Sequence, residues 1–168
     1  MDVDALLLEL YGRVEDHVVG AVADLDAAGL AAAPGPGANH IGWLVWHLTR
    51  VEDGHVAELL DVDQLYVTGS WAERLGMPPD PEDSGYGHTE EQVAAVEPGG
   101  PDLLLDYYRA VNARTRGYLA GLSPADLDRI VDERWDPPVT LGVRLVSIVD
   151  DQIQHAGQAR YLRGLLGR

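Results

Sequence analysis

The chain has 168 residues, of which 46% are hydrophobic and 24% charged, and this composition predicts one globular domain over residues 1–168. Its 12 Lys and Arg residues stand against 28 Asp and Glu residues, so the formal net charge is -16. Such an acidic surface repels phosphate groups, which argues against nucleic acid or an anionic membrane as a partner. Cysteine is absent, so any metal must be held by His, Asp, Glu or backbone oxygen.

No segment contains the ~18 consecutive apolar residues that a membrane-spanning helix needs. The N-terminal sequence MDVDALLLEL carries acidic residues where a secretory signal peptide would carry lysines. These features predict a cytoplasmic protein with no membrane partner.

Apolar residues at helical spacing predict four long helices. The first ends near Gly29, before the helix-breaking sequence PGPG, and Asn39 is the predicted N-cap of the second. The four predicted ranges are 3–30, 40–61, 102–120 and 141–166.

The connections between these helices are expected to be mostly loop with short helical pieces. A short helix is predicted within QLYVTGSWAERLGM, and PPDPEDSGYG is a loop by composition. Thr89 and Gln92 form a capping-box pattern, and SPADLD predicts one helical turn capped by Ser123. The two prolines of RIVDERWDPPVT exclude helix there and leave extended structure.

Four long helices and few strand signals predict an all-α fold, an antiparallel four-helix bundle with long, partly helical connections. The excursion of roughly forty residues between the second and third helices is long for a bundle. Long connections of this kind often cover a site, and the regions around Trp71 and Tyr86 are the candidates for such a cover.

Three side chains form a candidate metal site. Asp151 and His155 are four residues apart in the last helix, about 40° around its axis, so both face one side. Asp150 lies roughly 140° from His155 and should face elsewhere. His47 sits in the apolar sequence WLVWHL of a facing helix, where an imidazole needs a partner. The predicted ligands are therefore His47, Asp151 and His155.

Two imidazoles and a carboxylate suit zinc, and also nickel, iron or manganese. Three protein ligands leave a coordination position for water or substrate, which is typical of catalytic metal sites. Two alternatives need no metal: His47 as a core histidine bonded to a carbonyl, and a simple ion pair between Asp151 and His155.

The other histidines have weaker links to this site. His55 is ~12 Å further along its helix than His47, so it is predicted to be a solvated surface residue. His40 either starts its helix or lines a pocket mouth, and His17 is a candidate to support the site from behind. His88 is expected to lie in a loop.

Some aromatic and polar residues have two possible roles. Gln158 and Arg160 follow His155 and either reach the rim of the site or belong to an exposed helix face. Four aromatic residues either line an electrophile pocket or belong only to the core: Trp43, Trp46, Tyr107 and Tyr108.

The sequence NHIGWLVWHLTRVEDGHVAEL, followed about a hundred residues later by DDQIQHAGQARYLRGLL, resembles the DinB-like superfamily of metal-binding four-helix bundles. The segments GYGHT and ERWDPPVTLGVRLVS also resemble its mycothiol S-transferase-like branch. The resemblance implies that His47, Asp151 and His155 bind a divalent metal, often zinc or nickel. Many relatives carry glutamate or histidine at the position of Asp151, and the shorter aspartate leaves direct or water-bridged ligation open.

The resemblance implies a metal-dependent S-transferase that uses mycothiol, or another small thiol, as cosubstrate for electrophiles in detoxification. The absence of cysteine fits a sulfur atom that arrives with the cosubstrate. Alternatives are a thiol-dependent isomerase, a metal-water hydrolase, or a non-enzymatic metal-binding protein. A homodimer is a further expectation.

Overall fold

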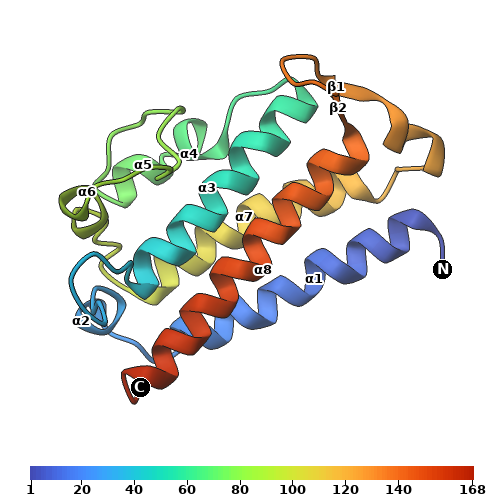
Figure 1. Cartoon of the computed structure of the whole chain (residues 1–168). Coiled ribbons are helices and arrows are strands. Elements are labelled where there is room, and N and C mark those ends of the chain that lie inside the picture. Colours follow the sequence, from blue (N-terminus) through green and yellow to red (C-terminus); the bar gives the residue numbers. More distant parts are fainter.

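The computed structural model describes residues 1–168 and confirms the predicted all-α fold. Its four long helices are α1 (Val3–Val22), α3 (Ile41–Leu60), α7 (Pro101–Leu119) and α8 (Leu141–Leu165). Figure 1 shows these helices lying side by side as a bundle, with the shorter elements gathered at its ends and along one side.

Helix α8 packs against both α3 and α1, and α7 packs against the same two helices from the other side. The long excursion after α3 returns the chain to the end where α3 began, so α3 and α7 run in the same direction (Figure 1). The bundle is antiparallel across the α3–α8 and α1–α7 pairs. The α3–α8 seam therefore joins residues about a hundred positions apart in the chain.

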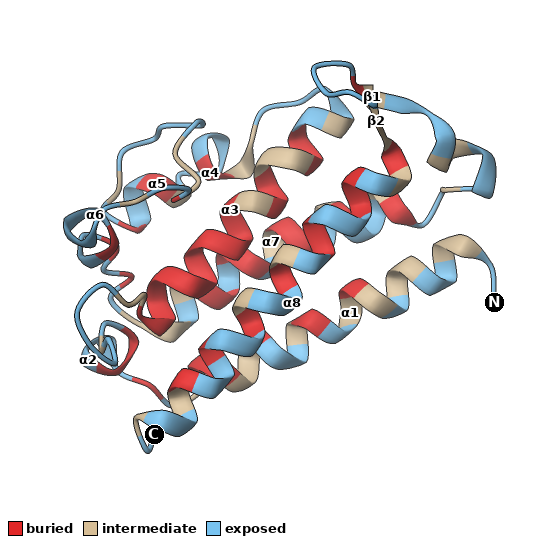
Figure 2. Ribbon diagram, in the orientation of Figure 1, coloured by how far each residue is buried: buried red, intermediate tan, exposed pale blue.

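The core lies between the inner faces of the four helices, which appear as the buried stripes in Figure 2. Helix α3 is the most deeply placed, since connections also cover its outer face. Its apolar sequence IGWLVWHL is buried throughout, as near-continuous hydrophobicity in a helix requires.

The prediction of one helix over residues 3–30 was wrong. Helix α1 ends at Val22, Asp24 adopts a left-handed conformation with φ 62°, and a separate short helix α2 spans Ala27–Leu30. The side chain of Asp26 caps α2 by accepting a hydrogen bond from the backbone of Gly29. Apolar side chains continue into the core across this turn, so their spacing gave no indication that the helix ends there.

The predicted N-cap of the second helix was also displaced by one residue. His40, not Asn39, is the N-cap of α3, and its Nδ1 accepts a hydrogen bond from the backbone N–H of Trp43. The other ring nitrogen of His40 donates to the carbonyl of Val93, which joins the start of α3 to the later connection. The expected helix-start role of His40 is therefore confirmed.

The connections contain short elements close to those predicted. Helices α4 (Leu65–Thr68) and α5 (Trp71–Arg74) precede the loop, and α6 (Glu90–Ala94) begins with the capping box of Thr89 and Gln92. After α7, the 3-10 helix η1 spans Pro124–Asp128, and strands β1 (Ile130–Asp132) and β2 (Val139–Thr140) form an antiparallel pair. This β-hairpin, with its loop 133–138, projects beside the start of α8.

None of the helices has the length and apolar character needed to cross a membrane.

Candidate metal centre

The structure brings His47, Asp151 and His155 together on the α3–α8 seam. Nε2 of His47 lies 3.8 Å from Oδ1 of Asp151, and Nε2 of His155 lies 3.5 Å from the same oxygen. One potential ligand atom from each residue lies within 4.8 Å of the others. The imidazole rings of His47 and His155 meet edge to face with centroids 4.8 Å apart.

Helical geometry explains why these three residues meet. Asp151 and His155 stand one turn apart on α8 and face α3, while Asp150 is exposed and accepts a hydrogen bond from Gln154 instead. His47 is buried on the face of α3 that packs against α8.

Hydrogen bonds fix the same tautomer in both histidines. Nδ1 of His47 lies 2.5 Å from the carbonyl oxygen of Ser84, and a carbonyl can only accept, so this nitrogen carries the proton. Nδ1 of His155 lies 2.9 Å from Oε1 of Gln158, an amide oxygen that also can only accept, so this nitrogen carries the proton too. Both Nε2 atoms therefore keep their lone pairs for a cation, as is usual for histidine ligands that are oriented by a second hydrogen bond.

This set of donors fits a divalent metal. Ligand atoms that are each ~2.1 Å from one tetrahedral zinc lie roughly 3.4 Å apart, close to the two measured N–O distances. Oδ2 of Asp151 is buried and has no hydrogen-bond partner, although buried carboxylate oxygens normally have one. Oδ1 is the oxygen that faces the two imidazoles, so a cation would supply that partner by binding both carboxylate oxygens.

The electrostatics of the two imidazoles differ. Burial lowers the pKa of His47 below its ordinary value, which favours the neutral form that binds metals. The adjacent Asp151 carboxylate raises the pKa of His155, so protons compete with a cation for this ligand as the pH falls.

Residues 80–88, which we call the site segment, cover His47 from outside the bundle. Gly85 in this segment has φ 91°, and a Cβ atom there would lie 2.8 Å from the ring of Trp46 and 3.1 Å from His47 Nδ1. Only glycine allows the backbone to approach this closely. The Ser84 carbonyl can therefore reach the imidazole.

His88 is a part of the site that the sequence did not indicate. Trp43 donates an indole hydrogen bond to its Nδ1, so its Nε2 carries the proton and donates to Asp83 at 2.8 Å. Its ring stacks on Trp46, while Trp43 stacks on His47 with centroids 4.6 Å apart. The two tryptophans thus pack the site segment against the ligand helix as well as filling the core.

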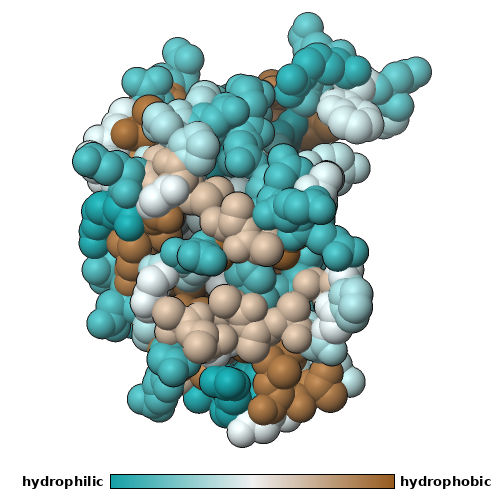
Figure 3. Space-filling model, turned by 90° about the vertical axis from the view of Figure 1, so that its left-hand side faces the viewer, coloured by the Kyte–Doolittle hydropathy of each residue, from teal (hydrophilic) through white to brown (hydrophobic).

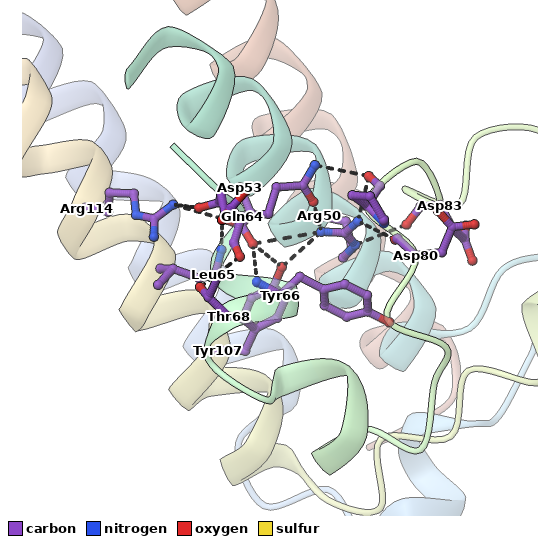
Figure 4. Close-up of polar contacts among 12 residues, drawn as sticks. Arg50, Asp53, Gln64, Leu65, Tyr66, Thr68, Asp80, Asp83, Tyr107 and Arg114 are labelled. Carbon is purple, nitrogen blue, oxygen red and sulfur yellow. Dashed lines mark hydrogen bonds and ion pairs between the residues drawn. The ribbon is translucent and has the colours of Figure 1, made fainter. Parts of the chain in front are cut away.

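Arg50 anchors the other half of the site segment from within α3 (Figure 4). Its buried guanidinium donates hydrogen bonds to the carbonyls of Asp80, Pro81 and Asp83, and also to the side chain of Gln64. Arg50 is three residues beyond His47, so one helix supplies both a ligand and the clamp on the segment that orients it.

A carboxylate on the other side of Arg50 completes this network (Figure 4). Asp53 lies 3.8 Å from Arg50 and accepts hydrogen bonds from the backbone of α4 and from the hydroxyl of Tyr107. Arg114 of α7 lies 3.7 Å from Asp53 and donates to the Asp63 carbonyl. The connection after α3 is thereby tied to both α3 and α7.

A second buried carboxylate, Glu52, lies inside the bundle. Its side chain has no exposed surface and accepts a hydrogen bond from Gln152 of α8, yet its Oε1 has no partner. No arginine or lysine contacts it, and burial raises its pKa to about 7.

Several predictions around the site were wrong. Trp71 packs on Tyr107 with ring centroids 5.4 Å apart, so the region around Trp71 does not cover the three ligands. The region around Tyr86, in contrast, covers His47 as expected, although the Tyr86 side chain itself is 94% exposed. His17 is exposed and cannot support the site from behind. His55 is half-buried and contacts Arg144, rather than being freely solvated.

The polar and aromatic residues for which two roles were predicted do not all take the same role. Gln158 orients His155, whereas Arg160 is exposed and crosses to α1, with its guanidinium where a Cβ on Gly20 would lie. Tyr107 and Tyr108 are buried in the core, away from the three ligands.

A cavity of about 380 Å³ lies at the end of the bundle formed by α2 and α6. Small residues such as Ala31, Ala38 and Ala94 line it, together with His88. Figure 3 shows this end of the molecule, with moderately apolar residues across its middle and hydrophilic residues around them. Asn39, His40, Glu90 and Glu97 also line it, so the site segment borders a hollow of mixed lining at this end.

The four-helix architecture is that of a DinB-like bundle. The chain belongs to the mycothiol-S-transferase family, whose model matches residues 7–167. It is also similar to a crystal structure titled as the conserved protein of a locus from Enterococcus faecalis. That match has a TM-score of 0.91 and 34% sequence identity, and covers 100% of this chain and 99% of that one. No curated protein matches the chain.

Proposed function

We propose that this protein is a divalent-metal-dependent S-transferase that conjugates mycothiol, or another small thiol, to electrophiles in detoxification. The observation that carries the proposal is the convergence of His47, Asp151 and His155 in a chain of the mycothiol-S-transferase family. We further propose zinc as the metal, ahead of nickel, iron or manganese, and the cytoplasm as the compartment.

A divalent metal bound by these residues would favour deprotonation of a thiol at an open coordination position. The residues of the chain prepare this centre. Ser84 and Gln158 hold the two imidazoles with Nε2 toward Asp151, and the tryptophans exclude water from one side of His47. The thiol sulfur then forms a bond to the electrophilic carbon, its proton passes to solvent, and any leaving group departs with the displaced electron pair.

The first test combines elemental analysis with a thiol panel. Protein purified without added metal is analysed for bound metals, then assayed with mycothiol, glutathione and bacillithiol against a generic electrophile. We expect conjugation of mycothiol to fall by on the order of 100-fold or more after chelation, and zinc to restore it. Full activity in metal-free protein would contradict the proposal, as would zinc-dependent ester cleavage without any thiol consumption.

The clamp by Arg50 leads to a second prediction. Arg50→Lys keeps the charge but cannot place donors on three carbonyls at once, because an ammonium lacks the guanidinium fork. The Ser84 carbonyl should then orient His47 less well, and the affinity for Zn²⁺ should fall by about tenfold. A competition titration with a chromogenic chelator measures this change.

Arg114→Lys is the matched control, because Arg114 belongs to the same network but does not contact the site segment. Its affinity for Zn²⁺ should equal that of the unmodified protein. If the two variants bind Zn²⁺ alike, Arg50 does not act on the ligands through the site segment.

A further inference from the structure

A cleft of mixed polar and apolar lining lies next to the candidate metal centre, where the β-hairpin loop 133–138 stands over α3 and α8. Its volume is about 540 Å³, and its lining includes His55, Arg134, Trp135, Arg144 and Ser147. A second hollow of about 390 Å³ shares His55 and Arg134 with this cleft and extends to Ser84, whose carbonyl binds His47. The two hollows thus lead from the β-hairpin loop to Ser84, the residue that contacts the ligand His47.

The cleft and the ligands follow the same seam between α3 and α8. Ser147 precedes Asp151 by four residues, so it lies roughly 6 Å along the axis of α8 from the carboxylate ligand. His55 follows His47 by eight residues, roughly 12 Å along α3. A molecule with one end at the metal centre would therefore enter the cleft within the length of a small organic chain.

The side chains of the cleft combine one aromatic surface with balanced charges. Trp135 is 65% exposed on the hairpin loop. Arg134 and Arg144 pair with Asp132 and Glu58 at distances of 2.8 to 3.4 Å, so two positive groups face two negative ones. The charges of the cleft thus balance, although the chain as a whole has a net charge of -16.

Several polar groups in the cleft still face solvent. The side chains of Arg134 and Glu58 are largely exposed in spite of their ion pair, and Ser147 is exposed on α8. Planar charged groups can bind neighbouring hydroxyls through paired hydrogen bonds, and an indole face packs against the C–H groups of a sugar ring. The lining thus offers both an apolar face and paired hydrogen-bonding groups, which suits a neutral polyol rather than an anion.

We propose that this cleft binds the neutral sugar portion of the thiol cosubstrate while the sulfur lies at the metal centre. The inference rests on the function proposed above and assigns a place to the part of the cosubstrate that does not react. In mycothiol a cysteinyl amide joins the thiol to a glucosaminyl-inositol group, and this link spans roughly 6 Å when extended. That length matches the separation between Asp151 and Ser147 along α8.

The cavity at the α2–α6 end is less suited to a neutral sugar. Its charged lining residues, Glu90 and Glu97, are both acidic, and it has no arginine and no exposed tryptophan, so it offers neither the paired opposite charges nor the indole face of the cleft. The two ends of the seam therefore differ in chemistry. The polyol belongs to the end near Trp135.

The test uses the glucosaminyl-inositol group without its cysteinyl part as a binding probe for the full-length, zinc-loaded protein. We expect a saturable NMR shift of the Trp135 indole N–H, assigned by its loss in Trp135→Phe. The enzymatic readout is the preference for mycothiol over N-acetylcysteine, given as the ratio of their kcat/KM values. Ser147→Trp fills the cleft and should lower this preference by about tenfold or more.

Val146→Trp is the matched control, since Val146 is the exposed neighbour of Ser147 and does not line the cleft. The preference of this variant for mycothiol should stay within about twofold of that of the unmodified protein. An unchanged preference in Ser147→Trp, or a probe that leaves Trp135 unshifted, would overturn the assignment of the cleft.

These outcomes also test the assignment of the cleft separately from the proposed S-transferase activity on which that assignment rests. If the zinc-loaded protein conjugates no thiol but the probe still shifts Trp135, the cleft assignment holds and the proposed S-transferase activity is rejected. If mycothiol is conjugated and Ser147→Trp keeps the full preference, the activity holds and the cleft assignment is rejected.

Discussion

Replacement of His47 or Asp151 by alanine is expected to lower the affinity for Zn²⁺ by more than about 100-fold, because loss of even an indirect supporting contact costs 10- to 100-fold. Each variant removes one of three ligands and leaves the other two too few for tight binding. Thiol conjugation should be lost in parallel. Competition titrations and elemental analysis of the purified variants measure the binding.

The helical fold should survive these changes, because neither side chain belongs to the hydrophobic core cluster and Asp151 is partly exposed. Circular dichroism checks this point. Asp150→Ala is the matched control, since Asp150 adjoins Asp151 but is exposed and bonded to Gln154. Tight Zn²⁺ binding by His47→Ala, or an equal loss in Asp150→Ala, would place the metal elsewhere.

The second large effect concerns stability and comes from Glu52. Burial raises the pKa of this carboxyl from its ordinary value of 4.5 to about 7, so the native state holds the proton more tightly than the unfolded state does. The free energy of unfolding is therefore unaffected by this group below pH 4.5 and decreases as the pH rises through the window from 4.5 to 7. Above this window the full cost remains, about 3 kcal/mol.

Glu52→Gln should remove this cost, because an amide stays neutral at every pH and can still bond to Gln152. Urea unfolding at pH 5, 6, 7 and 8 should show little difference from the unmodified protein at pH 5. At pH 8 the variant should be more stable by about 3 kcal/mol.

Glu58→Gln serves as the control, because Glu58 is on the same helix but is half-exposed and paired with arginines. Its stability relative to the unmodified protein should not rise between pH 5 and pH 8. If Glu52→Gln is less stable than the unmodified protein at pH 8, the Glu52 carboxylate is ionised and stabilises the bundle.

Much of the fold and the three candidate ligands could be predicted from the sequence because both depend on helical periodicity. Apolar spacing located the long helices, and the i, i+4 relation selected Asp151 over Asp150 as the partner of His155. The same spacing failed at Asp24, where a left-handed residue breaks the backbone while apolar side chains continue into the core. Periodicity reports which face is buried, not whether the helix is continuous.

The region around Tyr86 was expected to cover a site, but the contacts of the site segment could not be predicted because they join residues far apart in the chain. Arg50 binds carbonyls about thirty residues away, and the Ser84 carbonyl offers no side-chain signal at all. His88 lies in the sequence GYGHT, whose glycine at position 85 was the one local sign of a close backbone approach. Of the two regions expected to form the cover, the one around Tyr86 makes these contacts and the one around Trp71 does not.

The three candidate ligands come from only two of the four long helices, α3 and α8. About a hundred residues of sequence separate His47 on α3 from Asp151 on α8. An ion bound there would act as a removable cross-link that closes a loop of about a hundred residues, and so would restrict the unfolded chain much as a disulfide does. For a protein without cysteine, the cell's metal supply would then take the place of its redox state in setting how long the folded molecule persists.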